Sequence, residues 1–274
     1  MRQLIIEQNP DKNGLVLLEG KDFRYLRQVL RVKAGDMVNI CPPDGGLYES
    51  TVCKIDDNSK KITLQICGPL RQAQGPQEQQ NTLIEESSIQ FTLFQFIPKP
   101  QKLELIVRQA TECGVKNIIP VISEYAQKGS IQALQGSKLE RLERIVREAR
   151  QQSGSPVDTK VFEPVTVEQA IELWNKIKEE SGGEENSAGY VLSERSVEAP
   201  LRQAQGPQGP HDAHEGPKAV GIICGNEGGI SPQELELLEK KGLFCPIHFS
   251  VNILRCETAA LYGIAAIQTA VLGI

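Results

Sequence analysis

Strand-like and helix-like segments alternate along the chain from Ile89 onward. Short apolar runs predict buried strands, whereas apolar residues at every third or fourth position predict amphipathic helices. The predicted strands are residues 90–97, 118–122, 161–162, 189–192, 219–224 and 247–249. The predicted helices are residues 102–113, 138–151, 165–179 and 259–274, with a further helix after Ser231. This alternation favours an α/β fold, in which helices cover both faces of a mostly parallel sheet.

The first part of the chain has a different pattern. Turn sequences separate short strand-like segments at residues 14–18, 36–40, 48–52 and 61–66, which predicts a small β-barrel. A helical piece interrupts it, with apolar residues at Phe23, Leu26, Val29 and Leu30. We therefore expect a first domain at residues 1–68, a linker at 69–88 and a second domain at 89–274.

A nine-residue sequence occurs twice without change, at Pro69–Gln77 and at Pro200–Gln208. Units of a stacked repeat are longer and carry apolar faces, so these copies do not indicate a solenoid. We interpret both as inserted surface loops, the first within the linker and the second at about residues 200–217. His211 and His214 fall in the second loop. Without a third ligand nearby, they favour solvated side chains over a metal site.

Composition restricts where the protein acts and what it binds. Its 30 basic and 35 acidic residues give a net charge of −5, so binding to nucleic acid must be local. The seven cysteines include no Cys-x-x-Cys pair, which argues against a metal or disulfide framework and fits a reducing compartment. The apolar stretch at 259–274 is shorter than the ~20 residues of a membrane span. We expect a cytoplasmic protein with no metal and no membrane attachment.

Two segments near the C-terminus suggest one pocket. Gly225–Ser231 follows a predicted buried strand, and its glycines let a ligand approach the backbone. Asn252–Ala259 follows the next strand and places Arg255, Glu257 and Thr258 at the start of a helix. A loop that binds a nucleoside triphosphate would carry a Gly-Lys pair, and Gly225–Ser231 has no lysine. A loop that binds a dinucleotide would follow an early strand, whereas this segment lies late in the chain. Both ligands are therefore disfavoured. A plain tight turn would leave the polar residues of both segments unexplained, so we favour a binding function.

Basic residues cluster in two places. The helical piece of the first domain carries Lys21, Arg24, Arg27, Arg31 and Lys33. A second set recurs every third residue from Lys138 to Arg150, with glutamates between. The second set is typical of a solvated helix face with salt bridges. The first is therefore the better candidate for phosphate contacts.

These motifs together resemble the RsmE family of the SPOUT superfamily, which methylates uridine N3 in 16S ribosomal RNA. The resemblance covers nearly the whole chain. It is carried by Leu26–Arg31 with Gly35-Asp36, Lys102–Ile106, Ala110–Val115, Glu148-Ala149 with Gln152-Ser153, and the two late segments. It implies an N-terminal PUA-like β-barrel for RNA, a C-terminal SPOUT α/β domain with a trefoil knot, S-adenosylmethionine as methyl donor, a homodimer, and 16S rRNA or the assembled small ribosomal subunit as substrate.

The resemblance also implies site residues. Those expected at the cofactor are Leu192, Ser193, Cys224, Gly225, Asn226, Glu227, Gly228, Gly229, Phe249, Ser250, Val251, Asn252, Ile253, Leu254, Arg255 and Thr258. Those expected at RNA are Arg24, Arg27, Arg31 and Lys33. We hypothesise that Arg255 stabilises the uracil anion, while Glu227 or Glu257 assists proton transfer or orients Arg255.

The sequence departs from the family pattern at several positions, and the two nonapeptide loops are extra. The family usually has proline where Asn226 stands, glycine at Ser250, histidine at Tyr25 and arginine at Tyr125. Two other functions stay open. One is an RNA-binding protein without catalysis, and the other is a SPOUT methyltransferase that acts on another RNA or on a ribose oxygen. Stabilisation by S-adenosylmethionine would separate the first from an enzyme.

Overall fold

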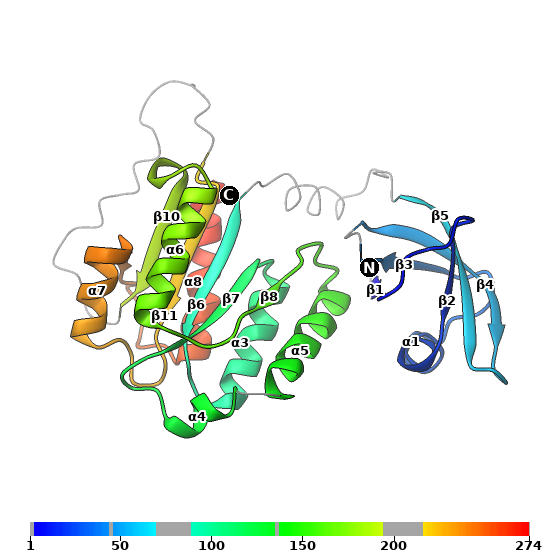
Figure 1. Cartoon of the computed structure of the whole chain (residues 1–274), viewed down its shortest axis with the longest axis horizontal. Coiled ribbons are helices and arrows are strands. Elements are labelled where there is room, and N and C mark those ends of the chain that lie inside the picture. Colours follow the sequence, from blue (N-terminus) through cyan, green and yellow to red (C-terminus); the bar gives the residue numbers. More distant parts are fainter. Residues whose placement is uncertain (1–2, 44–45, 70–88, 135–136, 194–215, 274) are drawn as a thin grey trace. The chain divides into compact units, whose positions relative to one another are not determined.

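The computed structural model describes residues 3–43, 46–69, 89–134, 137–193 and 216–273, and they form two compact units (Figure 1). One unit contains the N-terminal part of the chain together with Arg147–Asp158, and the other contains the remaining residues from Ser87 onward. The predicted linker at 69–88 lies outside the described residues except for Pro69. The predicted loop at 200–217 lies outside them except for residues 216–217.

The first unit is built on a five-stranded sheet with the order β1-β3-β4-β5-β2. Its strands are β1 (Gln3–Ile5), β2 (Leu15–Leu18), β3 (Met37–Cys41), β4 (Tyr48–Asp56) and β5 (Lys61–Pro69). β1 pairs with β3 in parallel, and the other pairs are antiparallel. All five strands contribute to one apolar core, which includes Leu4, Leu18, Ile40, Val52 and Ile62.

The predicted helical piece forms two joined turns of different kinds. An α-helix, α1 (Gly20–Arg24), continues into a π-helix, η1 (Tyr25–Leu30). Phe23 and Leu26 are buried, but Val29 is 56% exposed, so the predicted apolar face was wrong at Val29. The spacing expected for an α-helix fails there because a π-helix bonds each amide five residues back and so turns its side chains onto other faces.

The second unit contains a parallel sheet with the order β12-β10-β11-β6-β7-β8, and β9 pairs with β7. Its strands are β6 (Gln90–Phe96), β7 (Asn117–Ile122), β8 (Lys160–Val161), β9 (Val165–Thr166), β10 (Ser187–Leu192), β11 (Ala219–Cys224) and β12 (Cys245–Ile247). Each strand pair of this sheet is parallel. The predicted α/β class with a parallel sheet is therefore confirmed for this unit.

Helices cover both faces of this sheet, as the alternation of side chains along β6 requires. Phe91 and Leu93 belong to a core with α3 (Pro100–Glu112), α5 (Ser137–Ser153) and α8 (Cys256–Leu272). Phe94 and Phe96 belong to a core with α6 (Val167–Glu180) and α7 (Pro232–Gly242). In Figure 1, α6 and α8 lie on opposite sides of the strands. The remaining short helices are α4 (Lys128–Gln132) and η2 (Glu184–Asn186).

Two glycines form a slot for aromatic rings on the α6 face. Gly189 of β10 and Gly221 of β11 are direct partners across the strand pair. A Cβ atom at Gly221 would lie 3.0 Å from Trp174 and 3.1 Å from Phe244, and one at Gly189 would lie 2.9 Å from Phe244. The rings of Trp174 and Phe244 have their centroids 5.5 Å apart. The missing side chains thus allow both rings to lie directly on the sheet.

Several predicted boundaries were wrong. The last strand ends at Ile247 and does not extend to residue 249, while the final helix begins earlier than predicted, at Cys256. Residues 165–166 form β9, and Thr166 then caps α6 with a complete capping box. Arg150, predicted on a solvated face, is only 7% exposed and bonds Asp158 at 2.7 Å. No helix within the described part of the chain has both the length and the apolarity to cross a membrane.

Candidate active site

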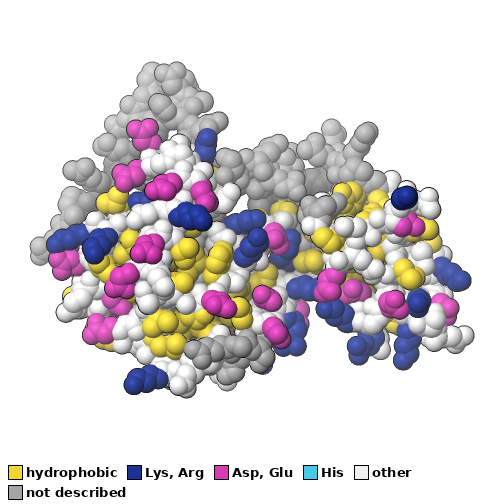
Figure 2. All heavy atoms as spheres, viewed as in Figure 1, with side chains coloured by type: hydrophobic (Ala, Val, Ile, Leu, Met, Phe, Trp, Pro, Cys, Tyr) yellow, Lys and Arg dark blue, Asp and Glu magenta, His cyan; other side chains and the backbone are white. Residues whose placement is uncertain are grey.

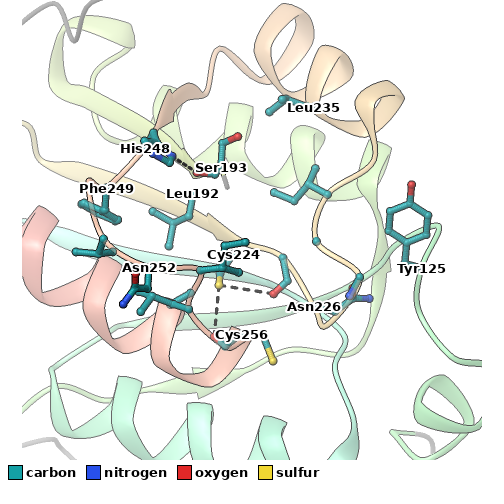
Figure 3. A pocket seen from close by; sticks show the side chains of 18 of the residues that line it. Tyr125, Leu192, Ser193, Cys224, Asn226, Leu235, His248, Phe249, Asn252 and Cys256 are labelled. Atoms are coloured by element: carbon teal, nitrogen blue, oxygen red, sulfur yellow. Dashed lines mark hydrogen bonds between the residues drawn. The ribbon is translucent and has the colours of Figure 1, made fainter. Parts of the chain in front are cut away.

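A cavity of about 250 Å³ opens where β10, β11 and β12 end (Figure 3). Parallel strands bring their carboxyl ends to one edge of the sheet, and loops from these ends form its walls. Figure 3 shows Tyr125 and Asn226 at one end of the cavity and Phe249 and Asn252 at the other. Of the residues predicted at the cofactor, those that line it are Leu192, Ser193, Cys224, Gly225, Asn226, Gly228, Gly229, Phe249, Val251, Asn252, Ile253 and Leu254.

Four residues predicted at the cofactor do not line this cavity: Glu227, Ser250, Arg255 and Thr258. They belong to the same two segments, but the lining is made by their neighbours. Seven further lining residues were missed, and they are Tyr125, Ile230, Pro232, Leu235, His248, Cys256 and Ala259. Most directly follow or precede predicted positions, so a wider window would have found them. Tyr125 comes from the β7–α4 connection, far away in sequence, and spacing alone gave no signal for it.

The glycine loop Gly225–Gly229 is held in place from within. Gly229 has φ 76°, a conformation that side chains disfavour. A Cβ atom at Gly225 would lie 3.0 Å from the backbone of Gly229, so the two ends of the loop touch. Asn226 is 5% exposed. Its Nδ2 donates to Ser123 Oγ at 3.0 Å and to Ile97 O at 3.4 Å, and its Oδ1 accepts from the Gly228 amide at 2.9 Å.

The loop runs directly into helix α7. Ser231 caps this helix, its side chain accepting from the Glu234 amide while Glu234 accepts from the Ser231 amide. The predicted capping box is therefore confirmed. Glu234 Oε1 also accepts from the amide of Glu124 at 2.8 Å. Residues 249–256 form the wall opposite the glycine loop, and two contacts hold them. The ring of Phe249 packs edge to face on the ring of Tyr262, and Cys224 Sγ donates to Cys256 O at 3.7 Å.

Lys102 joins the two acidic residues that were predicted to be catalytic. Its Nζ lies 3.4 Å from Glu227 Oε1 and 3.2 Å from Glu257 Oε2. Cys256 Sγ donates to Glu257 Oε2 at 3.2 Å. Burial opposes ionisation of Glu257, but the bonds from its own backbone amide, Cys256 and Lys102 lower its pKa overall. Burial, with the neighbouring carboxylates, raises the pKa of Cys256 to about 12, so Cys256 stays a neutral thiol.

Arg255 lies beside this cluster without joining it. It is exposed and holds the N-cap position of α8. Among the described residues, its guanidinium forms no ion pair with Glu227 or Glu257, both of which pair with Lys102. The hypothesis that one of these acids orients Arg255 is therefore not supported by the contacts seen. Arg255 stands between Leu254 and Cys256, which both line the cavity, and within the described part of the chain its guanidinium has no ion-pair partner, so it is available to a ligand.

The lining restricts which ligands fit. None of the described residues that line the cavity is a lysine or an arginine, so no lining side chain would hold a polyphosphate. The walls combine apolar side chains such as Leu192, Leu235 and Leu254 with the glycine-loop backbone. This combination suits a flat, uncharged heterocycle with a sugar. Within the described residues no three metal-ligating side chains converge, and His211 and His214 lie outside that part.

The basic residues predicted at RNA differ in their availability. Arg27 is held by Asp57, with two bonds at 2.9 and 2.8 Å, and by Val32 O at 3.1 Å. Arg24 is exposed and donates to Gly20 O at 3.4 Å. Arg31 and Lys33 are exposed, and Arg31 has the left-handed conformation with φ 56°. Figure 2 shows basic and acidic side chains interspersed on the visible face, with several basic side chains along the lower edge of the first unit.

Comparison with known families matches both units. A family described as the RNA methyltransferase domain matches residues 85–268, which is more than half of the chain. The chain belongs to the RNA methyltransferase family. A second family, the RNA methyltransferase PUA domain, matches residues 18–66. The expected PUA-like first domain and methyltransferase second domain are thereby confirmed, and the cavity lies within the RNA methyltransferase domain.

Curated relatives of this RNA methyltransferase extend over nearly its full length. Ribosomal RNA small subunit methyltransferase E of Rickettsia conorii is 28% identical, over 94% of this chain and 91% of the relative. The enzyme of that name from Aquifex aeolicus is 29% identical over 91% of each. A crystal structure of the Neisseria gonorrhoeae enzyme of that name, bound to S-adenosyl methionine, has a TM-score of 0.72 and 22% identity, covering 98% of this chain and 97% of that one. That likeness establishes a shared fold.

Proposed function

We propose that this protein transfers a methyl group from S-adenosylmethionine to N3 of a uridine in 16S ribosomal RNA. The observation that carries the proposal is the cavity at the ends of β10, β11 and β12, which has a glycine-loop wall and no lysine or arginine in its described lining. S-adenosylmethionine fits this lining because its adenosine is uncharged and carries no phosphate. The names of the full-length relatives supply the RNA class.

The chain's residues divide the work between holding the donor and handling the base. Gly225, Gly228 and Gly229 would let the donor approach backbone groups, while Leu192, Leu235 and Leu254 would surround its adenine. When bound, the donor supplies an electrophilic methyl group on a sulfonium. The target base must be unstacked or already unpaired to reach it. Exposed Arg255, which stands between the lining residues Leu254 and Cys256, would stabilise the negative charge that develops on uracil as N3 gives its proton to water. Once the methyl group is on N3, the donor would leave as S-adenosylhomocysteine.

The proposal includes a homodimer and a knotted C-terminal segment. Several apolar side chains of α8 and the segment before it are exposed, among them Ile253 at 80% and Tyr262 at 42%. Exposed apolar side chains beside a site favour a contact with another chain, and we propose that the other chain is a second copy of this protein. The trefoil knot is proposed from the resemblance to the SPOUT superfamily. We place the protein in the cytoplasm, where ribosomal subunits are assembled.

The test is methyl transfer by the full chain and by Arg255→Ala. Purified 16S rRNA and small subunits are incubated with labelled donor, and the nucleosides are analysed by mass spectrometry. We expect 3-methyluridine with the unchanged chain and a loss of at least a hundredfold with Arg255→Ala. Arg108→Ala, an exposed arginine on α3, serves as the control and should retain activity. Sedimentation should show both variants folded and dimeric.

Each alternative predicts a different result. A protein that only binds RNA would produce no methylated nucleoside, and its melting temperature would not change with S-adenosylmethionine. A methyltransferase with another target would yield a different modified nucleoside or would act only on another RNA. Unchanged turnover by Arg255→Ala would remove Arg255 from the mechanism.

A further inference from the structure

Lys102 connects three separate segments at the candidate active site. It lies in the first turn of α3, Glu227 lies in the glycine loop, and Glu257 lies in the first turn of α8. Its Nζ is 3.4 Å from Glu227 Oε1 and 3.2 Å from Glu257 Oε2. We propose that Lys102 is a positioning residue for methyl transfer, which holds the glycine loop and the start of α8 in one arrangement by pairing with both carboxylates. This inference rests on the proposed function.

The contacts around this triad exceed those of an isolated surface ion pair. The side chains of Lys102, Glu227 and Glu257 are 25, 33 and 16% exposed. Glu227 Oε1 also accepts from the Lys99 amide at 3.2 Å, and Lys102 Nζ lies 3.8 Å from Cys256 Sγ. Exposed single pairs contribute little to stability, whereas connected, partly buried networks contribute more. The triad therefore has the connectivity needed to fix its members.

The triad also borders the cavity. Glu227 stands between Asn226 and Gly228, and Cys256 directly precedes Glu257; all three of these neighbours line the cavity. Movement of either carboxylate would therefore move a wall. Because two walls from different parts of the chain are joined through one ammonium group, loss of Lys102 would release both at once.

The charge state of the triad argues for positioning over proton transfer. The groups that face one another are Lys102, Glu227, Glu257 and the Cys256 thiol, with Arg255 next to them in sequence. Although burial opposes it, the bond to Glu257 and the nearby carboxylates raise the pKa of Lys102 overall. The pKa of Glu257 is lowered. A carboxylate with a lowered pKa is a weak base, so Glu257 is poorly suited to take the proton from uracil N3.

The test compares Lys102→Met with Lys102→Arg. Without the ammonium group, Glu257 loses the bond to Lys102 that helps to lower its pKa, so Glu257 should titrate at a higher pH. Titration of the glutamate carboxyls by carbon NMR measures this shift directly, without a substrate. The acid limb of kcat/KM against pH should move in the same direction. The dissociation constant for S-adenosylhomocysteine should rise about tenfold, since a wall is released.

Three controls separate positioning from general damage. Lys102→Arg keeps the positive charge, so it should bind S-adenosylhomocysteine as the unchanged protein does and show the original pH profile. Lys176→Met removes a lysine whose ion pair, at 3.9 Å from Glu180, lies on an exposed helix face, and it should behave as the unchanged protein. In the double variant Lys102→Met/Glu257→Gln the carboxyl group of residue 257 is absent, so the upward shift assigned to Glu257 should be missing from the spectrum.

The inference and the proposed function fail in different ways. If the unchanged protein gives no methylated 16S rRNA, the proposed function is wrong, while NMR titration and ligand binding still test Lys102. If Lys102→Met keeps the original glutamate titration and ligand affinity, Lys102 is not a positioning residue, whatever reaction the protein performs. If Lys102→Met does not fold, Lys102→Arg and Glu257→Gln carry the test: Lys102→Arg must bind ligand as the unchanged protein does, and weakened binding contradicts the inference.

Discussion

Substitution of Asn226 by alanine should weaken ligand binding by loosening the glycine loop. The asparagine is 5% exposed and its side chain takes part in three hydrogen bonds, to Ser123, Ile97 and Gly228. Alanine leaves these partners without their bonds. Each unsatisfied buried group costs about 1–3 kcal/mol, and water can relieve part of this at the edge of a cavity. We expect a net loss of about 2 kcal/mol.

That loss converts to affinity if the loop must be ordered to bind. Because 1.4 kcal/mol corresponds to a factor of ten, the dissociation constant should rise about thirtyfold. Isothermal titration calorimetry with S-adenosylhomocysteine measures it, and urea denaturation measures any change in global stability. Asn186→Ala is the matched control. Asn186 donates one bond, to Gly182 O at 3.3 Å, on an exposed turn, so the change should be within about 0.5 kcal/mol.

An Asn226→Ala protein that binds the ligand as tightly as the unchanged protein would refute the reasoning. The same conclusion would follow if Asn186→Ala weakened binding equally. If global stability falls but affinity does not, Asn226 supports the fold and not the cavity.

Two further predictions concern the sheet and the RNA surface. Gly221→Ala places a Cβ atom 3.0 Å from a ring atom of Trp174 and should destabilise the second unit by about 1–3 kcal/mol. Urea unfolding, followed by the fluorescence of the chain's one tryptophan, measures this loss. The control is Gly129→Ala, where the new Cβ atom has no heavy atom within 4 Å, so this variant should not be destabilised. If Gly221→Ala and the unchanged protein unfold at the same urea concentration, the packing argument is wrong. Arg31→Ala should lower the slope of log affinity for RNA against log salt concentration by about 0.7–0.9. Arg27→Ala should lower it by less, because Asp57 already pairs with Arg27. If both variants lower the slope equally, the pair between Arg27 and Asp57 is broken when RNA binds.

Local sequence signals predicted much of the fold. The capping box at Ser231 depends on residues three positions apart, so it is visible in the sequence and is confirmed. The buried strand Ala219–Cys224 is a continuous apolar run and lies inside the parallel sheet as predicted. The start of α6 was misplaced because Val165 and Thr166 fit a helix pattern, whereas pairing with β7 draws them into the sheet.

Most of the parts that could not be predicted depend on distant contacts. Lys102 and Glu257 are far apart in sequence, and only the packing of α3 against α8 brings them together. The last strand was predicted too far along the chain because Phe249 is apolar, yet it packs on Tyr262 of α8 and not in the sheet. Val29 was misplaced because apolar spacing does not distinguish a π-turn from an α-turn. For Lys102 and Phe249 the deciding contact is distant in sequence, whereas for Val29 the deciding feature is a local hydrogen-bond pattern.

The slot formed by Gly189 and Gly221 places the chain's one tryptophan on the opposite side of the sheet from α8. Trp174 therefore reports on the core at the α6 face of the sheet. The buried residues of that core run from Phe94 to Phe244, so all of them precede α8 in the chain. The cavity needs α8 as well, which is the last element of the chain. Contacts between distant segments form late because the intervening chain must first close. During refolding, tryptophan burial should therefore precede the ability to bind a nucleoside, and the delay between the two signals would time the docking of the final helix.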